Sequence, residues 1–454
     1  MGLIILNTVL CSMPKIDALP FAVRSVLTRI AASFGRAWLV GGTVRDLLLG
    51  LQPHDFDITT DLPPEQVAAL IPEASVRDAK LGAVRLSSSL VITTLRAEAS
   101  YLDHRHPEQV WFITDPALDA QRRDFTVNAI YWDPIKDQWL DPVGGLVDLT
   151  ARCLRVIGDP EVRFTEDALR LLRAIRFSHR FDWVIDPATR TAMVAKAHLL
   201  KALSGERVYE ELTKLFTGPR RGAALRCLVE LGFAAQILPA VAAMEGVTQP
   251  PQYHPEGDVL THVAMVLDQV PEGDPVLAWA AVLHDVGKPP TWRQAADRIR
   301  FDGHDTLSAR MAEDILLRMS APRELRAAVV EICCDHIRMA SLQLMRPRRR
   351  EHWMRSPLFP KHLEFHRADC IGSHGNLSIY EAALAELRSL PPLREPLISG
   401  SDVVALGVPK GPMVGQFLRA VHDALDVPAA PEPDRERALV LLRDLVMRDF
   451  KPPS

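Results

Sequence analysis

The spacing of apolar residues changes along the chain. Residues 21–34 repeat apolar side chains as an amphipathic helix does, whereas residues 38–40, 56–59 and 90–95 are short apolar or β-branched runs typical of strands. This mixture of helical and strand patterns ends near residue 150. It predicts an α/β domain over residues 21–150.

Beyond this domain the strand signals fade and helical spacing dominates. Residues 165–245 have a helical pattern, and the proline-rich stretch at 249–255 indicates a boundary. A second helical region, which carries several histidines, continues to about residue 390, where Pro391 and Pro392 open a last, small helical segment. The predicted divisions are an N-terminal extension at 1–20, the α/β domain at 21–150, and helical regions at 151–245, 246–390 and 391–454.

Composition and charge narrow the possible partners. The chain has 454 residues, of which 48% are hydrophobic and 24% charged, so we expect a soluble globular protein with more than one core. The net charge of −4 gives no global attraction for nucleic acid, so a polyanion must be bound by a local basic patch. The six cysteines form no C-x-x-C pair, no run has the length of a membrane span, and the first residues lack the basic region of a signal peptide. These features predict a cytoplasmic protein with reduced thiols.

A glycine pair follows the first predicted strand. The apolar run at 38–40 leads into Gly41 and Gly42, and a helix is predicted at 44–49. Glycines before a helix leave backbone N–H groups free to bind phosphate, and Arg45 lies within reach of a triphosphate. A glycine pair alone indicates only a turn.

A D-x-D motif follows, at Asp55 and Asp57. Because a strand sends residues i and i+2 to the same face, the two carboxylates can together hold a divalent cation. A lone D-x-D more often marks a turn or a solvated strand end. Combined in this order, the glycine pair and the two carboxylates favour metal-assisted nucleotidyl transfer.

Residues 163–177 form a second concentrated signal. We expect Thr165 to cap a helix whose first turn is acidic. Arginines recur at helical spacing at positions 170, 173, 176 and 180. One interpretation is a solvated helix with favourable charge pairs. The other is that Asp167 and Arg170 read the edge of a base, because a carboxylate only accepts hydrogen bonds and a guanidinium only donates them. Such a pair suits the amino group and ring nitrogen that cytosine and adenine share.

Histidines and acids dominate the region from 254 to 370. His284 and Asp285 end an apolar helix predicted at 276–283 and supply two ligand types side by side. Any one histidine alone is more often a core or surface residue. Several in this arrangement indicate a metal site.

Seven segments, taken in order, resemble the class II tRNA nucleotidyltransferase/poly(A) polymerase family, and most of all bacterial CCA-adding enzymes with an HD domain. The resemblance is close over about residues 35–215. The segments are Leu39–Asp46, Asp55–Asp57, Tyr101–Pro107, Arg122–Ala129, Asp141–Gly145, Glu166–Arg170 and Ser204–Leu212.

The resemblance implies an α/β nucleotidyltransferase head, built on a small mixed sheet with helices, followed by an all-α neck, an HD-type helical body and a helical tail. It also implies roles for individual residues. Mg²⁺ would be held by the catalytic pair Asp55 and Asp57. Nucleotide would be bound by Gly41, Gly42, Arg45, Arg123, Asp124, Asn128, Asp167, Arg170, Arg173 and Arg176. Relatives often carry an acidic residue where this chain has Val91, so a third carboxylate is not assigned.

The histidine region resembles the HD phosphohydrolase superfamily. By this resemblance His262, His284, Asp285 and Asp369 would bind one transition metal, such as Ni²⁺ or Mn²⁺. His304 and His336 would extend the site to a second metal, and the two metals would activate water against a phosphoester. His254 and His374 are left as structural residues.

The family implies template-independent addition of C, C and A to the 3′ end of tRNA from CTP and ATP, with release of pyrophosphate, and an additional phosphohydrolase activity. Within the same chemistry, a CC-only enzyme, an A-only enzyme and a poly(A) polymerase stay open. From another class, a metal-dependent phosphohydrolase with an inactive head is the alternative. No membrane partner is expected, and the oligomeric state is left open.

Overall fold

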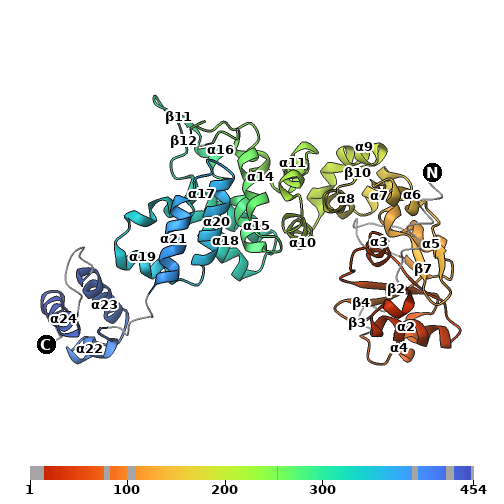
Figure 1. The fold of residues 1–454 in the computed structure, drawn as a ribbon, viewed down its shortest axis with the longest axis horizontal. Coiled ribbons are helices and arrows are strands. Elements are labelled where there is room, and N and C mark those ends of the chain that lie inside the picture. Colours follow the sequence, from red (N-terminus) through yellow and green to blue (C-terminus); the bar gives the residue numbers. More distant parts are fainter. Residues whose placement is uncertain are drawn as a thin grey trace.

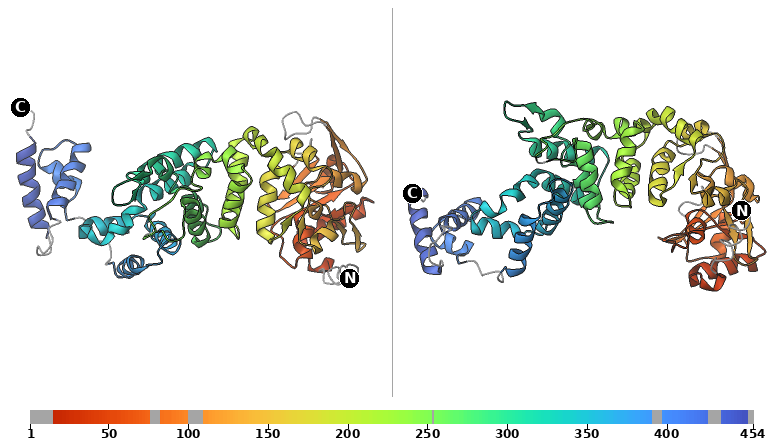
Figure 2. Two further views of the ribbon diagram at one scale, coloured as in Figure 1. Left: turned by 90° about the horizontal axis from the view of Figure 1, so that it is seen from above. Right: turned by 45° about the horizontal axis from the view of Figure 1, so that its top comes forward.

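The structure is a computed structural model and describes residues 15–75, 82–99, 109–252, 254–390, 397–425 and 434–450. The molecule is elongated (Figures 1 and 2). The N-terminal α/β head lies at one end and three helices near the C-terminus lie at the other, with helical regions between them. The predicted series of head, neck, body and tail is therefore confirmed. The motif at residues 101–107 and the two prolines Pro391 and Pro392 lie outside the described residues.

The head is built on a six-stranded mixed sheet with the order β3-β4-β2-β1-β7-β8. Strands β2 and β4 pair in parallel, and the other neighbours pair antiparallel. Its strands are β1 (Ala37–Leu39), β2 (Phe56–Thr60), β3 (Ala83–Ser87), β4 (Leu90–Thr94), β7 (Tyr131–Asp133) and β8 (Gln138–Leu140), with β5 (Arg96–Ala99) and β6 (Gln109–Phe112) as a separate pair. Its helices are α2 (Phe21–Ala32), α3 (Gly42–Leu48), α4 (Pro64–Leu70), α5 (Pro116–Gln121) and α6 (Gly145–Thr150), after a short turn η1 (Ile16–Ala18) and with η3 (Thr126–Asn128) before β7.

The neck is helical, with one small parallel strand pair that the sequence pattern did not predict. Its elements are α7 (Pro160–Glu166), α8 (Leu169–Phe181), α9 (Pro187–Lys196), η4 (Ala197–Ala202), α10 (Gly205–Phe216), α11 (Arg221–Glu230), α12 (Phe233–Ile237) and α13 (Pro239–Ala242), with strands β9 (Cys153–Leu154) and β10 (Val184–Ile185).

The predicted cap at Thr165 is wrong. Thr165 lies inside α7, where its hydroxyl donates to the carbonyl of Glu161, and α8 begins only at Leu169. The side chain of Asp159 caps α7 instead, followed by Pro160 at the first helical position. The segment predicted as one helix start is therefore a junction between two helices.

The body is a helical unit that includes one short hairpin. Its elements are α14 (Val259–Gln269), α15 (Pro275–Leu283), α16 (Lys288–Thr291), β11 (Arg293–Gln294), β12 (Ile299–Arg300), α17 (His304–Arg318), α18 (Arg323–Asp335), η5 (Ile337–Leu344), α19 (Pro347–Met354), α20 (Phe359–Ile371) and α21 (Ser378–Ser389). The tail helices α22 (Gly400–Ala405), α23 (Pro412–Leu425) and α24 (Arg435–Asp449) enclose a core of their own.

One apolar core runs from the head through the neck into the body. The neck and body approach closely at Gly205, where a Cβ would lie 2.2 Å from the carbonyl oxygen of Arg318. Nearby, the indole of Trp279 donates to the hydroxyl of Thr213 at 2.9 Å. The neck and body are thus packed as one unit and are not joined by a loose linker.

Candidate active site and candidate metal centre

The predicted glycine turn lies between β1 and α3. Gly41 has a φ of 71°, a left-handed conformation that favours glycine, and Gly42 begins α3. A Cβ on Gly41 would lie 3.1 Å from Oδ2 of Asp57. The missing side chain therefore leaves space beside this carboxylate.

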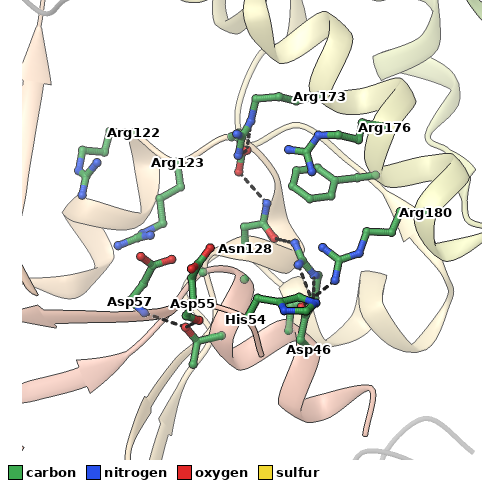
Figure 3. Close-up of a pocket in the computed structure, with 16 residues that line it drawn as sticks. Asp46, His54, Asp55, Asp57, Arg122, Arg123, Asn128, Arg173, Arg176 and Arg180 are labelled. Atoms are coloured by element: carbon green, nitrogen blue, oxygen red, sulfur yellow. Dashed lines mark hydrogen bonds and ion pairs between the residues drawn. The ribbon is translucent and has the colours of Figure 1, made fainter. Parts of the chain in front are cut away.

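The two acidic residues of the D-x-D motif lie at the start of β2. Asp57 is its second residue and Asp55 immediately precedes the strand. Figure 3 shows both carboxylates on one side of the strand, turned toward Arg123. The hydroxyl of Thr43 donates to the carbonyl of Asp55 at 3.0 Å, and its oxygen accepts from the amide of Asp57 at 2.8 Å. Thr43 thus fixes the D-x-D backbone against the start of α3.

Asp55 and Asp57 line a cavity of about 470 Å³ between the head and α8. The cavity brings together ten of the twelve residues predicted for the head site and adds six others. Its lining residues are Gly41, Gly42, Thr43, Arg45, Asp46, His54, Asp55, Asp57, Arg122, Arg123, Asp124, Asn128, Arg173, Arg176, Phe177 and Arg180.

The electrostatics at Asp57 suit a cation. Burial raises the pKa of Asp57, the charge of Arg123 lowers it in part, and the charge of Asp55 raises it further. A divalent ion between the two carboxylates would relieve both the burial and the repulsion. In the parallel pair of β2 and β4, Val91 is the register partner of Asp57. The position beside Asp57 therefore carries no acid.

Asp124 and Asn128 form a bonded network in the cavity wall. Arg173 donates to Oδ2 of Asp124 at 2.6 and 2.9 Å, and the amide of Asn128 donates to Oδ1 at 2.9 Å. Burial alone would raise the pKa of Asp124, but Arg173 and Asn128 hold it well below its usual range. The Asn128 oxygen in turn accepts from Arg45 at 2.7 Å. Arg45, predicted for the triphosphate, is 3% exposed and also binds Asp46.

The arginines of α8 tie the neck to the head. Arg173 binds Asp124, as above, and Arg180 donates to Asp46 at 3.0 Å. Arg176 instead pairs with Glu211 of α10 at 2.7 Å. These residues are only partly exposed, so the solvated-helix interpretation does not describe them. The helix supplies one wall of the cavity through salt bridges that span two domains.

Asp167 and Arg170 do not pair with each other, and neither lines the cavity. Asp167 binds Arg207 at 3.1 Å. Arg170 is buried, and it donates to the carbonyl of Arg122 and to Glu166. Their base-reading role remains a prediction.

A second network supports the two arginines that precede Asp124. Asp119 is fully buried, and its carboxylate accepts from Arg122 at 2.8 Å, from Arg123 at 2.9 Å and from the hydroxyl of Tyr131 at 2.7 Å. Sequence reasoning missed Asp119. Its position three and four residues before Arg122 and Arg123 could have indicated these ion pairs. It also missed the lining residues Thr43, Asp46, His54, Arg122, Phe177 and Arg180.

The six predicted ligands of the body come together in a second cavity, which His254 and His374 also line. Asp285 lies in the middle. Its Oδ2 lies 3.1 Å from Nε2 of His284, and its Oδ1 lies 3.4 Å from Nε2 of His304 and 3.9 Å from that of His336. His262 is 3.1 Å from Asp369 through its Nε2. The ligand atoms fall into two groups, one of His262, His284 and Asp369 and one of Asp285, His304 and His336.

Three of these histidines direct Nε2 into the cluster because Nδ1 faces a backbone carbonyl. The carbonyls belong to Ala281, Phe301 and Cys333, at 2.9, 2.7 and 2.7 Å from His284, His304 and His336, respectively. An imidazole that donates from Nδ1 presents an unprotonated Nε2, the form that binds a metal.

The donor set fits divalent metal ions. Both carboxylate oxygens of Asp285 are buried and accept no hydrogen bond from the described residues, although the ammonium of Lys288 forms an ion pair with Oδ2 at 2.7 Å. Burial lowers the pKa of His336 to about 4 and so favours the neutral imidazole. Burial also lowers the pKa of His262, but hydrogen bonds to Asp369 and Glu256 outweigh it and raise the value to about 9. The carboxylates of Asp369 and Glu256 therefore favour a positive charge at His262, which a bound cation would also supply.

The fold and the two sites define a nucleotidyltransferase head joined to an HD-type metal-binding body. Three family descriptions match the chain in the same order: "Poly A polymerase head domain" at residues 37–155, "Probable RNA and SrmB- binding site of polymerase A" at 183–245 and "HD domain" at 258–366. The A-adding tRNA nucleotidyltransferase of Deinococcus radiodurans is 32% identical over 89% of this chain and 94% of its own length. The chain belongs to the tRNA nucleotidyltransferase/poly(A) polymerase family.

Other relatives match only about half of the chain. The CCA-adding enzyme of Lactobacillus helveticus is 38% identical, but the match covers only 48% of this chain and 56% of the relative. Among solved structures, the Bacillus stearothermophilus CCA-adding enzyme in complex with CTP aligns over 93% of this chain and 96% of its own, with a TM-score of 0.71 and 26% identity. Among the described helices, none is long and apolar enough to cross a membrane.

Proposed function

We propose that this chain adds C, C and A to the 3′ end of tRNA, using CTP and ATP and releasing pyrophosphate. The observation that carries the proposal is the pair Asp55 and Asp57, which face one cavity beside the Gly41 turn and beneath the arginines of α8. Paired carboxylates, free backbone N–H groups and guanidinium groups are what a nucleoside triphosphate and its metal require.

In the proposed reaction the 3′-hydroxyl oxygen of the tRNA attacks the α-phosphorus. The bond between that phosphorus and the pyrophosphate oxygen breaks as the new phosphodiester forms. Asp55 and Asp57 would hold Mg²⁺, which would lower the pKa of the attacking hydroxyl, so that its proton is released to water, and would neutralise charge on the triphosphate. Arg123, which Asp119 holds in place, faces the same space and stabilises the phosphate oxygens.

The network around Asp124 positions the nucleotide. Arg173 neutralises Asp124, and Asn128 connects Asp124 to Arg45. We assign these residues to the ribose side of the pocket, with Arg176 in the adjoining wall. Base reading by Asp167 and Arg170 requires both side chains to leave their present partners, Arg207 and Glu166. That exchange is part of the proposal.

A second candidate is addition of A alone. It is favoured by the Deinococcus radiodurans relative, because that A-adding enzyme aligns over nearly the whole chain. About half of the chain instead matches a CCA-adding enzyme at higher identity. The two candidates share the catalytic carboxylates, so only the products separate them.

One assay distinguishes these activities. Purified protein with Mg²⁺ is given tRNA transcripts that end at the discriminator base, at −C or at −CC, with CTP, ATP or both. Full CCA addition extends all three to the same end. An A-only enzyme extends only the −CC transcript, a CC-only enzyme stops at −CC, and a poly(A) polymerase makes long products. If none of the transcripts is extended, the proposal is refuted. The remaining alternative is then a metal-dependent phosphohydrolase with an inactive head.

We also propose that the body hydrolyses a phosphoester with a transition metal, Ni²⁺ or Mn²⁺, bound by His262, His284, Asp285, His304, His336 and Asp369. The support is the double cluster around Asp285 and its two buried carboxylate oxygens. Hydrolysis of a 2′,3′-cyclic nucleotide is the test, and Asp285→Ala is the inactive control. Activity that survives in Asp285→Ala would refute the assignment. Because tRNA is the proposed partner, the cytoplasm remains our prediction for the compartment.

A further inference from the structure

Of the four histidines in the body cluster, His262 differs in how its ring is held. Its Nδ1 lies 2.9 Å from Oε1 of Glu256, whereas the other three rings face backbone carbonyls. The carbonyl of Gly372 is farther from the same nitrogen, at 3.3 Å. A carboxylate is therefore the nearer partner of His262.

Glu256 is itself placed for this contact. It lies before α14, and its side chain is only 4% exposed. The same Oε1 lies 2.8 Å from Nδ1 of His254, and Oε2 is buried with no hydrogen-bond partner among the described residues. Burying a carboxylate costs free energy unless its charge is paired and hydrogen-bonded. The two imidazoles are the donors nearest to Glu256.

We propose that Glu256 is a positioning residue that makes the two metal positions of the body unequal. The proposal rests on the proposed metal site and goes beyond it. Glu256 fixes His262 with the proton on Nδ1, directs Nε2 toward Asp369, and increases the electron density that this nitrogen offers to a metal. The position of His262, His284 and Asp369 therefore fills first. His304 and His336 face backbone carbonyls through Nδ1 instead, and their position fills second.

The neighbouring residue His254 allows a sharp control. Its ring lies 4.8 Å from that of His262 in an edge-to-face arrangement, so it competes for the carboxylate without reaching Asp369. If Glu256 acts through His262, replacing His254 by phenylalanine keeps the ring contact and the Glu256–His262 bond. If Glu256 merely holds His254 in place, replacing His254 by phenylalanine weakens metal binding as much as removing the charge of Glu256 does.

The test is metal binding by the full chain after chelation. Calorimetric titration with Mn²⁺ gives the stoichiometry and affinities, and titration with Co²⁺ gives a visible spectrum that reports coordination without any turnover. The wild type is expected to bind two ions per cluster in two steps. His304→Ala removes the weaker step and thereby assigns it.

Glu256→Gln keeps the volume and removes the charge. It is expected to weaken the tighter step roughly 10- to 100-fold and to change the Co²⁺ spectrum at the first equivalent, while the weaker step is retained. Glu256→Asp, which keeps the charge, is expected to recover part of the loss. His254→Phe and Glu245→Gln, an exposed glutamate in the same region, are expected to leave the tighter step unchanged.

Wild-type affinity for both steps in Glu256→Gln overturns the inference while the metal site itself stands. An equal loss in His254→Phe also overturns it, because the carboxylate would then act through His254. If the wild type binds no metal, the proposed metal site fails as well. Thermal unfolding of the metal-free variants separates a loss of folding from a loss of binding, and Glu256→Asp carries the test if Glu256→Gln does not fold.

Discussion

The hydroxyl of Thr43 accepts a hydrogen bond from the backbone amide of Asp57 at 2.8 Å and thereby holds the start of β2 in register with the glycine turn. The same hydroxyl donates to the carbonyl of Asp55. One side chain at the start of α3 thus sets the position of both acids. The Gly41 turn, proposed to bind nucleotide, and strand β2, proposed to bind metal, are thus held together by one side chain.

Replacing Thr43 by valine is therefore expected to slow nucleotide addition without unfolding the head. The loss of two hydrogen bonds lets the acids move, and small displacements of reacting groups reduce the rate roughly 10- to 100-fold. Single-turnover incorporation of CTP and ATP over a range of Mg²⁺ concentrations measures the effect. Thr43→Ser retains the hydroxyl and should keep nearly the wild-type rate. A normal rate in Thr43→Val would mean that the strand holds Asp57 without help.

Asp55→Asn and Asp57→Asn are each expected to reduce nucleotide addition by roughly a thousandfold or more. Each change removes a charged metal ligand, and the metal contributes several kcal/mol to the stabilisation of transition-state charge. Primer extension on the three tRNA transcripts measures the loss. Hydrolysis of the cyclic nucleotide by the same samples serves as the internal control, because the body is unchanged. Full extension by either variant would contradict the metal assignment.

Asp167→Ala is expected to relax base choice more than it reduces the rate. A hydrogen bond to a charged group contributes about 1.5 to 3 kcal/mol, so misincorporation of UTP and GTP should rise roughly 10- to 100-fold. Competition between correct and incorrect nucleotides on a −CC transcript measures the ratio. Arg207→Ala is the matched variant, since it removes the present partner of Asp167 and leaves the carboxylate free to read a base. Unchanged selectivity in Asp167→Ala would exclude this residue from base reading.

Acid should destabilise the head through Asp119. Although burial raises the pKa of Asp119, the charges of Arg123 and Arg122 and the hydroxyl of Tyr131 hold it well below its usual range. A lowered folded-state pKa stabilises the protein fully above the unfolded value, near 4, and this contribution is lost as the pH falls toward the folded value. Asp119→Asn should cost about 3 kcal/mol at neutral pH. Denaturant unfolding between pH 5 and 3 should show a smaller pH dependence in Asp119→Asn than in the wild type, and equal slopes would contradict the prediction.

Metal should stabilise the body. An ion present at a hundred times its dissociation constant adds about 2.7 kcal/mol to the free energy of unfolding, because only the folded cluster binds it. Thermal unfolding with Mn²⁺ and after chelation measures this increment. Asp285→Asn should lose it, since both groups of ligands meet at that carboxylate. An increment of the same size in Asp285→Asn would place the bound ion elsewhere.

Much of the head and the metal cluster was predictable because it depends on short-range chemistry. Three local patterns are present in the structure as predicted. They are the Gly41 turn, the placement of Asp55 and Asp57 on one side of β2, and the adjacent pair His284 and Asp285. The helix predicted at 44–49 and the strand predicted at 90–95 also appear within two residues as α3 and β4.

Long-range partners were not predictable in this way. The bonds of Arg170 depend on how α8 packs against the head, and helical spacing does not specify that packing. Asp159 and Pro160 did carry a local signal for a helix start, which the arginine pattern obscured. Glu256 lies in an irregular segment, where no periodicity connects it to His262.

The common core that joins neck and body has an evolutionary consequence. Leu225 and Leu228 of α11 are completely buried in the core that α14 shares. A protein truncated after the neck would expose these apolar side chains to water and would aggregate. If a lineage loses the hydrolytic activity, we therefore expect individual metal ligands to be substituted while the inactive body is retained for its structural role.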